Sequence, residues 1–231
     1  HSAGGGLTSG GSNTAIGDRA LISDTLGSDS VAIGRNALFT QNFTTATSSY
    51  NVAIGRDAGA SISTGIENTI IGALAGDSVN TGGHNTFVGY QSGGVNTSAS
   101  NNTALGSYSL DANQTGTSNV AVGKSALGAC TTGSGNTAVG LNALDATIDG
   151  VNNTAMGLNA LGADAVGENV AVGNNALLVC TASNNTAVGS GSGKAVTSGS
   201  QNVFVGTNAG DAVIGGANHV AIGFNALTTC T

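Results

Sequence analysis

The residues best suited to chemistry are three cysteines, Cys130, Cys180 and Cys230, which lie fifty residues apart. A thiol can form a disulfide, bind a metal ion or pack as a small apolar group. Metal binding is the least favoured of these uses, because no second Cys or His stands at ligand spacing from any of the three. Buried free thiols and disulfides between chains both remain open.

The other reactive groups are scattered. His1, His84 and His219 share no spacing, and the twelve Asp and Glu residues do not recur as a carboxylate pair, which a glycosidase-like site needs. The stretch GSGSGK at 189–194 resembles a phosphate-binding loop, but Ala195 stands where Ser or Thr is required and no helix is expected to follow. We therefore expect no enzymatic activity, no cofactor and no metal site.

The charge and hydropathy of the chain argue against two kinds of partner, nucleic acids and membranes. The formal net charge is −7 and only five residues are basic, so the chain cannot neutralise a run of phosphates and nucleic-acid binding is not expected. No stretch of 18 or more apolar residues exists, and so no membrane span is predicted. The chain begins with His1 rather than Met, which indicates a processed form or a fragment.

A short pattern repeats thirteen times along the chain, and the cysteines and the other residues discussed above lie within or between its copies. It is Asn, any residue, a small residue, an aliphatic residue and Gly, and we number each copy from this closing glycine as position 0. The spacing is 17 residues in most copies, with one of 21 and two of 16. A fixed period of this size predicts stacked copies of one unit. The closing glycines are Gly17, Gly34, Gly55, Gly72, Gly89, Gly106, Gly123, Gly140, Gly157, Gly173, Gly189, Gly206 and Gly223.

Positions −3 to −1 predict a short strand. Position −3 is Thr or Val, position −2 is Ala in ten copies, and position −1 is always aliphatic. Side chains alternate between the two faces of a strand, and both faces here are small or apolar, as in a strand buried on both sides. One coil has only one interior. We therefore expect the Ala face at position −2 to approach a neighbouring chain.

The rest of each copy is expected to close the coil. The glycine at position 0 is predicted to turn the chain, with a positive φ. Positions +1 to +4 are expected to form a second strand, in which Leu at +4 fills the interior and Ala or Ser at +3 faces outward or toward a neighbouring chain. A polar loop completes the coil. The cysteines all fall at position +7, on every third coil, about 14 Å apart at the usual strand spacing, which exceeds the ~7 Å that a disulfide within one chain allows.

Position −4 predicts an amide ladder. Asn side chains stacked on equivalent residues pair donors with acceptors and fix the register, which is a structural use of Asn. Ser30 and His219 are the two exceptions. The ladder residues are Asn13, Asn51, Asn68, Asn85, Asn102, Asn119, Asn136, Asn153, Asn169, Asn185 and Asn202.

The units NTAIG, SVAIG, NVAIG, NTAVG and NVAVG resemble the head repeats of trimeric autotransporter adhesins of the YadA type. The run GNTAVGLNAL is similar to repeats in some phage tail fibres. The resemblance implies a left-handed parallel β-roll with three chains side by side, that is, a homotrimer. The sequence differs from the adhesin heads in its longer repeat period. It also shows no coiled-coil heptads and no anchor segment.

Together these patterns predict an all-β protein, a parallel β-roll or β-helix solenoid of about 13 coils with a ~17-residue repeat. Residues 1–12 are a Gly-rich N-terminal segment, and 13–231 are a single repeat array that could belong to a longer fibre. We expect an extracellular or cell-surface structural or adhesive fibre that self-associates, as a homotrimer or end to end, and could meet a cell-surface glycan or protein receptor. The alternative is a virion component, a phage tail fibre segment for host recognition. A polysaccharide-processing β-helix enzyme is less favoured, because the chain has few aromatic residues and no Trp.

Overall fold

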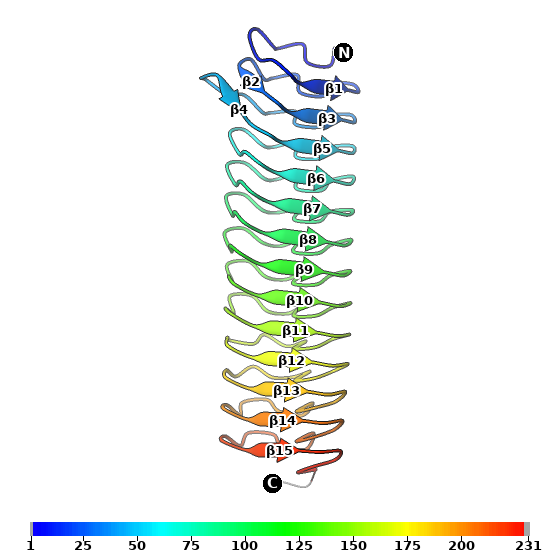
Figure 1. The fold of residues 1–231 in the computed structure, drawn as a ribbon, viewed down its shortest axis with the longest axis vertical. Coiled ribbons are helices and arrows are strands. Elements are labelled where there is room, and N and C mark those ends of the chain that lie inside the picture. The colour runs from blue at the N-terminus through cyan, green and yellow to red at the C-terminus, as the bar shows by residue number, and fades with distance from the viewer. Residues whose placement is uncertain (1, 229–231) are drawn as a thin grey trace. The chain divides into compact units, whose positions relative to one another are not determined.

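The computed structural model describes residues 2–228, which fall into two compact units that divide between Ser118 and Asn119. Each unit is a parallel β-solenoid in which one three-residue strand per coil stacks on the strand of the next coil (Figure 1). The described residues form strands and turns and contain no helix. The predicted fold class, an all-β parallel solenoid with a ~17-residue repeat, is confirmed.

The first unit carries two parallel sheets. The larger sheet stacks β1, β3, β5, β6, β7 and β8, and the smaller one pairs β2 with β4 at the coil enlarged to 21 residues. The bounds are β1 Thr14–Ile16, β2 Gly27–Ser28, β3 Val31–Ile33, β4 Thr47–Ser48, β5 Val52–Ile54, β6 Thr69–Ile71, β7 Thr86–Val88 and β8 Thr103–Leu105.

The second unit repeats the larger sheet with seven strands in chain order. The bounds are β9 Val120–Val122, β10 Thr137–Val139, β11 Thr154–Met156, β12 Val170–Val172, β13 Thr186–Val188, β14 Val203–Val205 and β15 Val220–Ile222. Each residue pairs with its equivalent one coil later, for example Ala138 with Ala155. The register therefore follows the repeat.

The closing glycine has the predicted positive φ, between 123° and 141° in the described coils. It also lies directly against the next coil: a Cβ on Gly157 would stand 2.5 Å from the carbonyl oxygen of Gly173. Both features exclude a side chain at this position.

The Ala face of the strand points into the coil, not toward another chain. Ala32, Ala53, Ala121 and Ala138 at position −2 are fully buried, while positions −3 and −1 are partly or largely exposed. The sequence prediction that position −2 meets a neighbouring chain is therefore wrong. Small residues occur at −2 because Leu side chains at +4 fill the same interior.

Positions +1 to +4 form a turn, which corrects the predicted second strand. Residues at +2 and +4 adopt left-handed backbone conformations, such as Asn142 with φ 53° and Leu144 with φ 53°. A left-handed L-residue costs about 1–2 kcal/mol, but the stack compensates, since Leu144 N donates to Ala160 O at 3.1 Å. The turn points both +3 and +4 inward, so Ala143 at +3 is buried rather than outward-facing as predicted.

The sizes of the side chains at positions −2 and +4 compensate for each other in the core: a larger residue at one goes with a smaller residue at the other. Leu occupies +4 in most coils, but +4 is Gly where a bulky residue occupies −2 of the same or the following coil. An added Cβ on Gly193 would stand 2.9 Å from the Phe204 ring, and one on Gly210 would stand 2.4 Å from it. Each large ring at −2 therefore fills the space that two leucines fill elsewhere.

The N-terminal segment follows the path of the coil after it. Gly4 N donates to Ala20 O at 2.8 Å, sixteen residues ahead, and Thr8 N donates to Thr25 O at 3.0 Å, seventeen residues ahead. Its glycines leave room for this contact, since a Cβ on Gly10 would stand 2.1 Å from the carbonyl oxygen of Gly27. Residues 4–12 thus form the return part of a coil.

Candidate functional site

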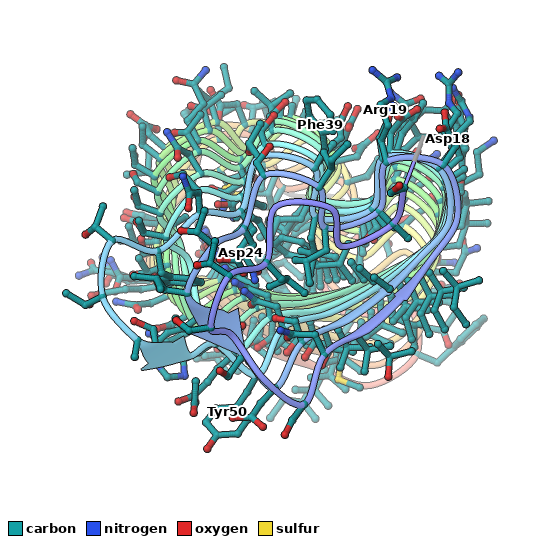
Figure 2. All side chains as sticks on the ribbon, turned by 90° about the horizontal axis from the view of Figure 1, so that it is seen from above. Asp18, Arg19, Asp24, Phe39 and Tyr50 are labelled. Atoms are coloured by element: carbon teal, nitrogen blue, oxygen red, sulfur yellow. The ribbon has the colours of Figure 1, made fainter. Side chains whose placement is uncertain are left out.

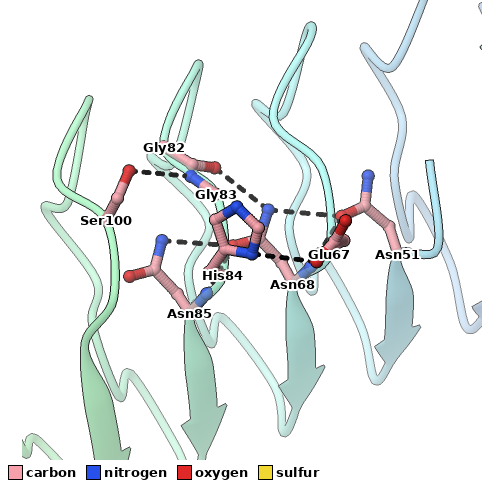
Figure 3. Close-up of polar contacts among 8 residues, drawn as sticks. All are labelled: Asn51, Glu67, Asn68, Gly82, Gly83, His84, Asn85 and Ser100. Atoms are coloured by element: carbon pink, nitrogen blue, oxygen red, sulfur yellow. Dashed lines mark hydrogen bonds and ion pairs between the residues drawn. The ribbon is translucent and has the colours of Figure 1, made fainter.

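The asparagines at position −4 form an interior ladder. Asn68 Nδ2 donates to Gly82 O at 3.0 Å and to Asn51 Oδ1 at 3.2 Å, and Asn68 N donates to the same Oδ1 at 3.0 Å (Figure 3). The Asn51 amide oxygen thus satisfies the backbone N–H just before β6, while the Asn68 amide nitrogen satisfies a loop carbonyl. Every residue of the ladder except Asn13 is fully or almost fully buried, so these side chains are closed to ligands.

A buried polar cluster, which the sequence reasoning missed, replaces the ladder at Ser30. Gln41 Oε1 accepts from Asn51 Nδ2 at 2.8 Å, while Gln41 Nε2 donates to Ser30 Oγ at 3.0 Å and to Asp24 Oδ2 at 2.7 Å. Asp24 Oδ1 accepts from Gly27 N at 2.9 Å. Asp24 lies inside the coil, whereas Tyr50 projects outward (Figure 2).

This cluster is closed to solvent, and its role is structural. Asp24 and Gln41 occupy position +7, where other coils place interior residues such as Ile62 and Val79. Aligning the coils at +7 would have found it, because a polar residue at an interior position requires partners.

The two described cysteines are interior residues. Cys130 and Cys180 are free and fully buried. Cys130 Sγ donates to Gly133 O at 3.5 Å, and Asn185 Nδ2 donates to Cys180 Sγ at 3.5 Å. Burial raises the pKa of the Cys130 thiol to about 11 and raises the pKa of Cys180. Cys230 lies outside the described residues.

This burial argues against disulfides between chains at Cys130 and Cys180. Neither thiol can reach another chain unless its coil opens. Neutral thiols packed as small apolar groups fit the interior, because Val196 and Val213 hold the same position in other coils.

We predict that both thiols resist modification in the folded chain. In a Cys230→Ser variant, dithionitrobenzoate at pH 8 should label Cys130 and Cys180 at least about 100-fold more slowly than in 6 M guanidinium, because each thiol is buried and mostly protonated. The labelled fraction is read by absorbance and by peptide mass. Rapid stoichiometric labelling of the native chain would contradict the buried position, as would a dimer band on a non-reducing gel.

The histidines and the Gly-rich stretch take structural positions. His84 Nδ1 lies 2.9 Å from Glu67 Oε2 on adjacent coils, with both side chains about half exposed (Figure 3). His219 continues the ladder, with its N donating to Asn202 Oδ1 at 2.9 Å. Residues 189–194 form a turn. Within residues 2–228, no three or more His, Cys, Asp or Glu side chains are placed to hold a metal ion.

One edge of the coil is built from positions +2 and +5. Figure 2 shows Arg19, at +2, beside Phe39, at +5 of the following coil. The Arg19 Cζ lies 5.2 Å from the centroid of the Phe39 ring, a cation–π contact. Residues at +2 and +5 of neighbouring coils therefore lie within side-chain contact.

Further along the first unit, this edge brings together two carboxylates that are far apart in sequence. Asp77 and Asp111 occupy +5 two coils apart. Burial raises the pKa of both, and the charges of Asp111 and Asp57 raise that of Asp77 further. The two carboxylates thus lie close enough to repel each other, although no fixed spacing in the sequence indicated a pair.

Two tyrosines lie beside these carboxylates. The Tyr90 and Tyr108 rings are 5.4 Å apart between centroids, at an interplanar angle of 81°. Both side chains are exposed. Partial desolvation raises the pKa of Tyr108, with Tyr90 and Asp111 contributing to the shift. We name Tyr90, Tyr108, Asp77 and Asp111 the tyrosine edge.

Comparisons with protein families, with curated proteins and with solved structures found no match to this chain. A search of residues 2–228 for a helix long and apolar enough to cross a membrane also found none.

Proposed function

We propose that the chain is a non-enzymatic segment of an extracellular structural or adhesive fibre, in which copies pack side by side through the outer face of the strands. The observation that carries the proposal is the apolar character of this face. Aliphatic side chains at position −1 stand in register in each unit and remain uncovered, among them Leu105, Met156, Val188 and Ile222.

The form of the face supports self-association. Three-residue parallel strands place β-branched and aliphatic side chains in straight rows, a surface that a second copy can cover with little loss of side-chain entropy. Thr at position −3 adds small hydroxyls and no charge. The resemblance of the repeats to adhesin heads favours three chains around this face.

The oligomeric state tests the proposal. We expect light scattering on the purified chain to give about three times its 22.0 kDa mass, and electron micrographs to show rods. A Met156→Lys/Val188→Lys variant should dissociate, because it places two charges in the apolar face.

The matched control is Asn142→Lys/Asn175→Lys, which adds the same charge at position +2. Arg19 already occupies this position with the same left-handed backbone, so a long cation is compatible with it. The control should keep the oligomer. A monomeric parent chain, or dissociation of the control as readily as of the face variant, would overturn the proposal.

A further inference from the structure

The Asp111 carboxylate of the tyrosine edge leans across a glycine toward the coil of Asp77. An added Cβ on Gly94, at +5 of the intervening coil, would stand 2.5 Å from Asp111 Oδ1. The Asp111 carboxylate therefore lies over Gly94, displaced from its own coil toward that of Asp77. Neither carboxylate makes an ion pair with another described residue. The edge thus holds two partly buried negative charges without a cation between them.

The tyrosines offer aromatic faces beside these charges. In an edge-to-face pair, one ring presents its rim to the other, so Tyr90 and Tyr108 each keep at least one face that the partner ring does not cover. Tyr90 is 43% exposed and Tyr108 is 37% exposed. An aromatic face attracts cations, through its quadrupole, when they lie within about 6 Å of the centroid.

The chemistry of the edge selects among ligand classes. A metal ion is disfavoured, because no third His, Cys, Asp or Glu in the described residues joins the two carboxylates. A neutral sugar would leave the repulsion between Asp77 and Asp111 unrelieved. A cation with an apolar shell offsets this repulsion and contacts the rings at the same time. Arg19 over Phe39 makes such a contact on the same edge.

We propose that the tyrosine edge binds an organic ammonium group, of the kind carried by a lysine side chain or a choline headgroup. The carboxylates supply charge, and the rings supply the π faces. This inference goes beyond the proposed fibre function and stands whether or not the chain oligomerises.

Titrations of the full chain, carrying ¹³C-labelled tyrosine, test the proposal. The chain has three tyrosines, and Tyr50 at another corner serves as the internal reference. Choline chloride and Nα-acetyl-lysinamide, at constant ionic strength, should shift the ring signals of Tyr90 and Tyr108 saturably and leave Tyr50 unchanged. The tighter of the two ligands identifies the source of the ammonium group.

Variants separate the charge from the rings. Tyr108→Leu should weaken binding about three- to five-fold, the size of an exposed cation–π contact. Leu fits this backbone, since Leu74 holds position +2 with the same φ of 58°. Asp111→Asn should weaken binding about three-fold. The control Tyr50→Gln, a residue found at the equivalent position 201, should bind like the parent chain.

Neutral probes complete the test. The isosteric alcohol 3,3-dimethyl-1-butanol and the sugar glucose should leave the Tyr90 and Tyr108 signals unshifted. Shifts from either neutral probe equal to those from choline would overturn the proposal, and so would full ammonium binding by a folded Asp77→Asn/Asp111→Asn chain. Unchanged circular dichroism of each variant confirms that it is folded.

Discussion

Replacing Gly157 by alanine should destabilise the second unit by about 3 kcal/mol or more, the sum of the backbone strain at a φ of 136° and of overpacking against the next coil. The added Cβ would stand 2.5 Å from the carbonyl oxygen of Gly173 and 2.7 Å from its carbon, both backbone atoms of the next coil. The coils must separate to admit it. That separation weakens the hydrogen bond from Gly173 N to Met156 O, which is 2.8 Å long.

Gly223→Ala is the matched control. Gly223 has the same type of backbone, with φ 123°, but an added Cβ would meet no atom within 4 Å. Only the backbone strain of a non-glycine residue at this φ, about 1–3 kcal/mol, should appear. Urea unfolding followed by circular dichroism measures both variants. Equal losses would mean that the glycine is required for its φ alone and that contact between coils plays no part.

The second large effect concerns the exchange of core volume around Phe204. Phe204→Ala should cost about 3–5 kcal/mol, because a fully buried ring leaves a cavity. Gly210→Leu should also destabilise the unit, since its Cβ alone would stand 2.4 Å from the ring. The triple variant Phe204→Ala/Gly193→Leu/Gly210→Leu should instead recover most of the loss, to within about 2 kcal/mol of the parent chain.

The backbone already permits this rearrangement. Gly193 and Gly210 have φ of 60° and 65°, and leucines at the same position, +4, adopt φ of 49° to 57°. The triple variant would recreate the combination of Ala138 with Leu127 and Leu144 found in the same unit. Urea unfolding of Phe204→Ala, of Gly193→Leu/Gly210→Leu and of the triple variant closes the cycle. Losses that simply add in the triple variant would show that positions −2 and +4 do not share one space.

Part of the candidate site could be predicted from the sequence, and part appeared only in the structure. The ladder position could be read from the repeat, because Asn recurs at one offset and has the donors and acceptors for a stack. The tyrosine edge could not be predicted from the repeat. Its carboxylates are separated by a whole coil, and only the absence of a side chain at Gly94 lets Asp111 lean toward Asp77.

The sequence alone determined the period, the strand residues and the closing glycine. These features are local: alternation within a strand and the steric demand for glycine are visible in any single copy. It also determined that Leu at +4 is interior. It did not determine which strand face is interior, because Ala at −2 is compatible with burial, and so are Thr or Val at −3 and the aliphatic residue at −1.

The tertiary structure decided that question. Left-handed residues at +2 and +4 fold the chain back, so that Ala143 and Leu144 occupy the space over the −2 face. The same turn places Cys130, Cys180 and Asp24 inside the coil and leaves the aliphatic rows of the strands outside. The left-handed conformation of Leu at +4 carries no signature in the sequence, since Leu adopts it only when the stack compensates for the strain, whereas Asn at +2 tolerates it more readily.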